Sequence, residues 1–189
     1  LEASPVNFLD RQRDRLQAAR ETISSFLGAD KEGFGFVDNA TTGVGCVLQS
    51  IAFKPNDEIL TTSQVYNGVR QLMTRVATDA RCSYREIPIT VPVTSSEELL
   101  QQVTSSIKPE TKLLVIDHVA SASGIVFPVN EIVRYLKNKG VLVLVDGAHA
   151  PGMLDVSLSS IGADWYIGNL HKWVCAPLGA GFVWASNAT

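Results

Sequence analysis

The chain has 189 residues, of which 46% are hydrophobic and 19% charged, and its formal net charge is −3. These values are ordinary for one globular domain with a buried core, and they exclude a disordered chain. The 16 basic and 19 acidic residues are spread without a basic stripe, which argues against a nucleic-acid partner. No apolar run approaches the roughly 20 residues needed to span a bilayer, so no membrane partner is expected.

The ends and the cysteines give further expectations. The opening residues, LEASPVNFLDRQRDR, lack the apolar core of a signal peptide, so we expect a cytoplasmic protein. Cys46, Cys82 and Cys175 are odd in number and far apart, which predicts neither a disulfide framework nor a zinc site. Because the chain opens with Leu1 and stops at Thr189, shortly after an apolar segment, we expect a piece of a longer protein.

The first half of the chain alternates helical and strand-like patterns. Apolar positions recur at helical spacing from 8 to 27, and Gly28 follows as a stop signal. We then expect a short strand running into a polar turn at 33–43, a helix at 44–53, a strand at 58–63 and a helix at 68–80.

The alternation continues to the end of the chain. Ser95 and Glu98 form a capping box that opens a helix to about Ile107. Further strands are predicted at 84–90, 112–119, 141–146, 164–168 and 181–186, and a helix at 130–140. Strands that alternate with helices predict a three-layer α/β/α domain with a mainly parallel sheet covered on both faces. Ligands in such sheets bind beyond the strand carboxyl ends, where residues 39–43, 117–123 and 146–149 fall.

Asp146 ends the apolar run VLVLV, so its carboxylate would emerge at the mouth of a buried strand. In the low dielectric of a protein interior, the attraction between this carboxylate and a positive partner would be strong. The plain alternative is an Asp that caps the following turn. A third interpretation, the metal-facing Asp of a P-loop nucleotide hydrolase, fails because the chain has no G-x-x-x-x-G-K-[ST] motif.

Lys172 stands among apolar, aromatic and small residues in IGNLHKWVCAPLGAG. Desolvation there would lower its pKa toward the neutral amine that Schiff-base chemistry needs, although a solvated lysine is the usual case. Upstream, N-A-T-T-G at 39–43 places two hydroxyls and a glycine between a strand and a helix. Backbone N–H groups at a helix start bind phosphate, but a plain N-cap explains the same residues equally well.

The joint pattern is more specific than its parts. N-A-T-T-G, Tyr66, D-G-A-H at 146–149 and N-L-H-K at 169–172 follow in the order seen in fold-type I enzymes that use pyridoxal 5′-phosphate (PLP). From about Phe8 to Ser186 the chain resembles the class V aminotransferase family, in the branch of isopenicillin N epimerase and cysteine desulfhydrase. The resemblance implies that residues 1–189 are an incomplete PLP-binding large domain, a C-terminal small domain being absent.

The resemblance also implies roles for single residues. Lys172 would form the Schiff base with PLP and move the Cα proton, and Asp146 would pair with the pyridine nitrogen. Tyr66 would stack on the ring, while His149 and Ser121 would lie near its phenolic oxygen. The phosphate would be held by Ala40, Thr41, Thr42 and His171, with Asn169 assisting. His118 receives no role.

The implied function is chemistry at the Cα or Cβ of an amino acid substrate by a full-length homodimer. We expect a cysteine desulfhydrase-like C–S lyase that forms pyruvate, ammonia and sulfide. Epimerisation of an amino acid is the nearest alternative, followed by aminotransferase and cysteine desulfurase activity. A pseudoenzyme or binding fragment is the alternative from another class, and the presence of Lys172 and Asp146 argues against it.

Overall fold

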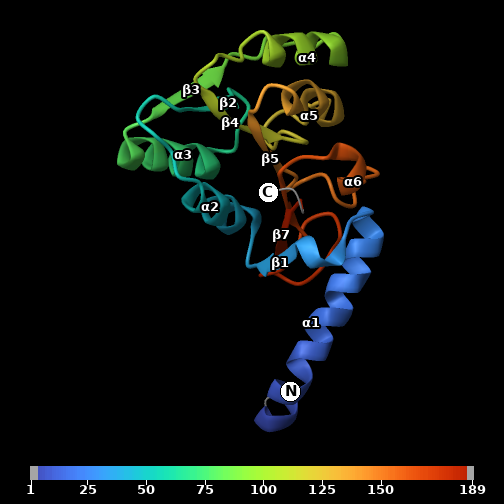
Figure 1. Cartoon of the computed structure of the whole chain (residues 1–189). Helices are drawn as coiled ribbons and strands as arrows, with labels where there is room; N and C mark the ends of the chain where they lie inside the picture. Colours follow the sequence, from blue (N-terminus) through green and yellow to red (C-terminus); the bar gives the residue numbers. More distant parts are fainter. Residues whose placement is uncertain (1–3, 187–189) are drawn as a thin grey trace.

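The computed structural model describes residues 4–186, which form a seven-stranded sheet with helices on both faces (Figure 1). The strands are β1 (Phe34–Val37), β2 (Glu58–Thr62), β3 (Ser83–Ile87), β4 (Thr111–Asp117), β5 (Leu142–Asp146), β6 (Trp165–Asn169) and β7 (Gly181–Ala185). The helices are α1 (Pro5–Leu27), the 3₁₀ turn η1 (Lys31–Gly33), α2 (Ala40–Ser50), α3 (Asn67–Ala80), α4 (Ser96–Thr104), α5 (Val129–Lys137) and α6 (Leu158–Ile161).

The strand order is β1-β7-β6-β5-β4-β2-β3. The pairs from β6 to β3 are all parallel, whereas β7 runs antiparallel to both of its neighbours. This arrangement confirms the predicted mainly parallel sheet. Strands β4 and β5 are paired in register, so that Asp117 lies beside Asp146 where both strands end.

Alternate residues of the central strands enter two separate apolar layers. On one face, Leu113, Val115 and Leu144 pack against α2 and α3. On the other face, Leu114, Ile116, Val143 and Val145 pack against α4, α5 and α6. Figure 1 shows the two helix layers on either side of the sheet. Because side chains alternate along a strand, Asp117 and Asp146 fall on the face covered by α2 and α3.

Helix α1 extends away from the sheet over its first half (Figure 1). Its apolar side chains Val6, Leu9 and Leu16 are 45–69% exposed, whereas Leu27 at its end is buried. Gly28 then stops the helix in the left-handed conformation, with φ of 58°. Of the helices within residues 4–186, none has the length and apolar character needed to cross a membrane.

Several predicted boundaries were wrong, among them those of α2, β3 and α4. The turn N-A-T-T-G is in fact the N-cap and first turn of α2, because the Asn39 side chain accepts the Thr42 N–H and starts the helix there. Strand β3 ends at Ile87 because Pro88 has no N–H for the ladder. Helix α4 ends at Thr104, before Ser105 and Ser106, whose hydroxyls donate to the carbonyl of Gln102.

Candidate active site

A cavity of about 500 Å³ lies at the carboxyl ends of β4, β5 and β6, against the first turn of α2. This is where a doubly covered parallel sheet places its ligands. The structure brings all ten predicted site residues together here, although they come from five separate segments of the chain. They are Ala40, Thr41, Thr42, Tyr66, Ser121, Asp146, His149, Asn169, His171 and Lys172.

The Lys172 amine lies 2.9 Å from Nε2 of His149, and the indole N–H of Trp173 donates to Nδ1 of the same ring at 3.3 Å. A nitrogen that accepts a hydrogen bond carries no proton, so the neutral imidazole must hold its proton on Nε2. That proton can only be donated to an amine that has a free lone pair. This arrangement of hydrogen bonds favours the neutral form of Lys172.

Desolvation agrees with this assignment. Burial lowers the pKa of Lys172, against the attraction of the Asp146 and Asp117 carboxylates. Burial also lowers the pKa of His149, and the nearby Lys172 charge lowers it further. A neutral amine is the nucleophile that attacks a carbonyl carbon, so Lys172 is prepared for covalent chemistry.

Asp146 lies at the bottom of the cavity with 3% of its surface exposed. Its Oδ1 accepts the N–H of Ala148 at 3.0 Å, so the capping interpretation is correct as far as it goes. The residue nevertheless lines the cavity as well as capping the turn. Burial raises the pKa of Asp146, which marks a carboxylate that would gain from a cationic partner.

The first turn of α2 forms another wall of the cavity. Asn169, at the end of β6, accepts the N–H of Ala40 through its Oδ1 at 2.8 Å and so ties the strand to the helix start. Thr41 and Thr42 add hydroxyls to the positive end of an 11-residue helix. Gly181 allows this approach, because a Cβ there would lie 3.0 Å from the backbone of Asn39. The wall is suited to an anion.

The remaining predicted residues stand at the rim. His171 donates from Nδ1 to the carbonyl of Ala180 at 3.0 Å, which leaves Nε2 for the cavity. Tyr66 is half exposed at the start of α3, and Ser121 is exposed in the loop after β4. An aromatic ring on an open wall offers a flat surface for stacking.

Sequence reasoning missed two residues of this site. Asp117 lines the cavity next to Asp146, and its position at the end of an apolar strand was the same signal that singled out Asp146. Trp173 directly follows Lys172 in the sequence, but its bond to His149 has no local signature. His118 is buried on the opposite face, where Nδ1 lies 2.8 Å from the Tyr166 hydroxyl.

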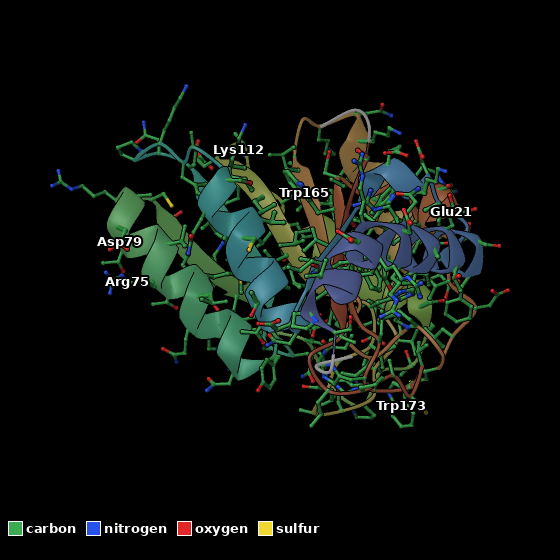
Figure 2. All side chains as sticks on the ribbon, turned by 90° about the horizontal axis from the view of Figure 1, so that it is seen from below. Glu21, Arg75, Asp79, Lys112, Trp165 and Trp173 are labelled. Carbon is green, nitrogen blue, oxygen red and sulfur yellow. The ribbon has the colours of Figure 1, made fainter. Side chains whose placement is uncertain are left out.

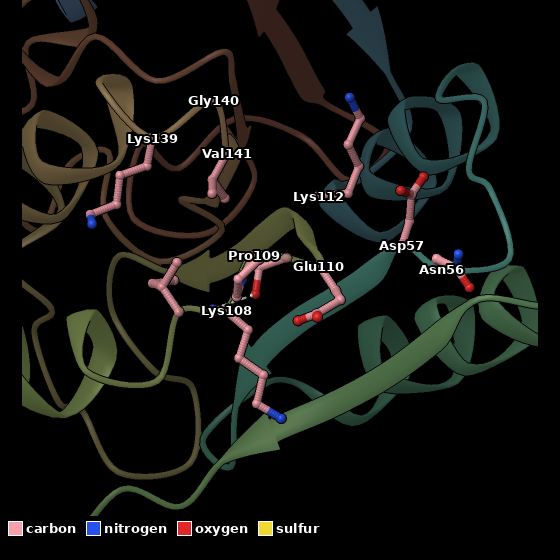
Figure 3. A pocket seen from close by; sticks show the side chains of 11 residues that line it. Asn56, Asp57, Lys108, Pro109, Glu110, Lys112, Lys139, Gly140 and Val141 are labelled. Atoms are coloured by element: carbon pink, nitrogen blue, oxygen red, sulfur yellow. Dashed lines mark hydrogen bonds between the residues drawn. The ribbon is translucent and has the colours of Figure 1, made fainter.

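A second and larger hollow, of about 640 Å³, lies at the amino ends of β2, β4 and β5 (Figure 3). Lys112 beside this hollow and Trp173 beside the first cavity stand on opposite sides of the molecule (Figure 2). The hollow contains exposed lysines and none of the predicted site residues. We therefore place the chemistry in the cavity around Lys172.

Comparisons with known proteins identify the family of the chain. The chain is 37% identical over 185 residues to isopenicillin N epimerase of Amycolatopsis lactamdurans, covering 96% of this chain and 46% of that protein. It is 32% identical over 180 residues to L-cysteine desulfhydrase of Arabidopsis thaliana, covering 87% of this chain and 40% of that protein.

The fold is also similar to that of a solved enzyme structure. A cystine C–S lyase in complex with its reaction product, cysteine persulfide, superposes with a TM-score of 0.90 at 25% identity, covering 97% of this chain and 49% of that one. The chain thus spans about half the length of the relatives it matches. The aminotransferase class-V profile matches residues 6–189. The chain therefore belongs to the class V aminotransferase family of PLP-dependent enzymes.

Proposed function

We propose that this chain is the PLP-binding large domain of an enzyme that cleaves a C–S bond of cysteine or a related amino acid, and that the full-length enzyme is a homodimer. The observation that carries the proposal is the contact of the Lys172 amine with His149 in a cavity that also holds Asp146. A solved mutant relative, 26% identical with a TM-score of 0.86, has glycine covalently linked to its PLP cofactor.

The residues present fit PLP at both ends of the molecule. The first turn of α2, with Thr41 and Thr42, suits the phosphate. Asp146 suits the ring nitrogen, because a buried carboxylate with a raised pKa gains from a positive partner. A volume of about 500 Å³ is within the range of small-molecule sites.

PLP, when bound, supplies an electron sink for a carbanion at the substrate Cα. The protein supplies the groups around it. Lys172 is the base that takes the Cα proton, and its lowered pKa keeps it competent for that task near neutral pH. His149, held in one tautomer by Trp173, orients the lysine amine through its Nε2.

C–S cleavage is supported by the relatives and by the cysteines. The desulfhydrases and the cystine lyase among the relatives are named for breaking this bond. Cysteine and water would give pyruvate, ammonia and hydrogen sulfide, so no oxidant is needed. Desulfurases that store a persulfide need a nucleophilic cysteine at the site, and within residues 4–186 none of Cys46, Cys82 and Cys175 lines the cavity.

Epimerisation is the second candidate, favoured by identities of 37% and 33% to two isopenicillin N epimerases. Both reactions begin with removal of the Cα proton by the same lysine. They diverge afterwards, when a sulfur leaving group departs or a proton returns to the opposite face.

One experiment separates the two reactions. The full-length protein, loaded with PLP, is incubated with L-cysteine in deuterated water, and pyruvate, sulfide and deuterated cysteine are measured. We expect pyruvate and sulfide in equal amounts. Deuterated and racemised amino acid without pyruvate would contradict C–S lysis and support epimerisation.

The covalent attachment is tested independently by borohydride reduction and peptide mapping. The adduct should fall on Lys172 and disappear in Lys172→Ala, whereas Lys139→Ala, at an exposed lysine far from the cavity, should keep it. An adduct on Lys139, or none at all on the full-length protein, would contradict the proposal.

A further inference from the structure

We infer that Asp117 and Asp146 act as one carboxyl pair that holds a single proton, with Asp117 as the protonated member and as a positioning residue for the Asp146 carboxylate. The inference deepens the proposed function, because it assigns the charge at the end of the cavity where Asp146 would meet the ring nitrogen. The two residues come from different strands, 29 positions apart in the chain.

The sheet register brings the two side chains together. Asp117 and Asp146 are Cα partners in the parallel ladder of β4 and β5, and each is 3% exposed. Side chains at paired positions of a parallel ladder project to the same face, and both of these line the cavity. Two ionised carboxylates at neighbouring strand positions repel each other strongly when water is excluded.

The hydrogen bonds identify the member that keeps the proton. Asp146 Oδ1 accepts the N–H of Ala148 at 3.0 Å, and such a bond stabilises a negative charge. Asp117 Oδ2 is buried and has no hydrogen-bond partner within residues 4–186. A buried charged oxygen without a donor costs far more free energy than a neutral acid in the same place. The proton therefore belongs on Asp117.

The other charged groups around the pair do not move the proton from Asp117 to Asp146. Burial and the Asp146 carboxylate raise the pKa of Asp117 to about 8, against the weaker effects of a backbone hydrogen bond and of attraction from Arg70 and Lys172. Arg70, on α3, is already paired with Glu86 at 2.7 Å. Burial lowers the pKa of Lys172, which weakens its attraction, and burial lowers the pKa of the adjacent His118 to about 4, so His118 is uncharged at pH 7.

The pair therefore presents one negative charge at neutral pH. One charge matches one protonated ring nitrogen, whereas two would leave an unpaired buried carboxylate. Above about pH 8, Asp117 loses its proton and a second negative charge appears beside Asp146. This change should alter the affinity for PLP, and the break that it causes near pH 8 should be lost when Asp117 is replaced.

Carbon-13 NMR of the full-length, cofactor-free protein, labelled at the aspartate carboxyl carbon, tests the inference directly. We expect one carboxyl resonance to titrate with a midpoint near 8 and to vanish in Asp117→Asn. In Asp146→Asn the midpoint should fall by one unit or more, because the neighbouring charge is gone. A resonance of Asp117 that titrates in the ordinary acid range, or whose midpoint Asp146→Asn leaves unchanged, would overturn the carboxyl pair.

PLP titrations between pH 6 and pH 9.5 add a second readout. The dissociation constant of the wild-type protein should change slope near pH 8, and Asp117→Asn should lose that break. A break that persists in Asp117→Asn would refute the role of Asp117. If the protein binds no PLP, the proposed function fails, while the NMR titration still decides the state of the pair.

Discussion

Trp173 donates its indole N–H to Nδ1 of His149 at 3.3 Å, although the two residues are 24 positions apart. This bond assigns the His149 proton to Nε2, the nitrogen that faces Lys172 at 2.9 Å. The protonation state of the nucleophilic lysine therefore depends on a half-exposed tryptophan that itself lies outside the cavity lining.

Trp173→Phe should raise the pKa of Lys172. Without the indole donor, His149 can hold its proton on Nδ1 and accept from a charged Lys172 ammonium at Nε2, which stabilises the charged amine. A neutral hydrogen bond is worth about 1 kcal/mol, so the shift should be about 0.5–1 pH unit. The measurement is the pH profile of the rate at which cofactor-free protein attaches PLP, which should move to higher pH.

Trp165→Phe is the matched control, because Trp165 starts β6 and stands away from the cavity (Figure 2). Its profile should coincide with that of the wild-type protein. If Trp173→Phe also left the profile unmoved, the tautomer assignment of His149 would be wrong.

Asp146→Asn should keep the fold and part of the PLP affinity but lower kcat by about two orders of magnitude or more. The amide preserves the shape and the bond to Ala148, yet it cannot hold a proton on the ring nitrogen. Steady-state kinetics at saturating substrate measure the loss. Asp79→Asn removes an exposed carboxylate on α3 and should retain wild-type turnover. If kcat of the Asp146→Asn enzyme were within a few-fold of the wild-type value, Asp146 would serve only as a turn cap.

Asn169→Asp should separate helix capping from phosphate binding. The carboxylate keeps an acceptor for the Ala40 N–H, 2.8 Å away in the native protein, and a negative charge at a helix start is stabilising by about 0.3–1 kcal/mol. The same charge repels a phosphate at this wall, so the affinity for PLP should fall about tenfold or more.

Fluorescence titration with PLP and thermal unfolding of the cofactor-free protein give the two readouts. Asn56→Asp adds the same charge at an exposed turn before β2, away from the cavity, and should change neither. Undiminished PLP affinity in Asn169→Asp would move the phosphate away from the start of α2.

Gly147→Ala should destabilise the protein by about 1–3 kcal/mol or more, as overpacking does. A Cβ at Gly147 would overlap the ring of Tyr166, which is fully buried and fixed by its hydroxyl against His118. Urea unfolding measures the change. Gly35→Ala is the control, since a Cβ there meets nothing within 4 Å. Equal stability of the two variants would mean that Tyr166 moves aside freely.

Much of the fold follows from local pattern. The alternation of apolar strands with helical spacing predicts the three layers and the parallel sheet, because side-chain periodicity depends only on neighbouring residues. The apolar run before Asp146 places its carboxyl at a strand end, and the apolar setting of Lys172 indicates desolvation. Both residues do lie in one cavity.

The partners of the site residues were decided by tertiary structure. The order of strands in the sheet is not encoded in local periodicity, so nothing in the sequence pattern places Asp117 beside Asp146. The bond from Asn169 to Ala40 joins positions 129 residues apart. Such pairings, and the pKa values that depend on them, arise only when the sheet excludes water and brings the strand ends together, because electrostatic coupling depends on distance in space and on burial.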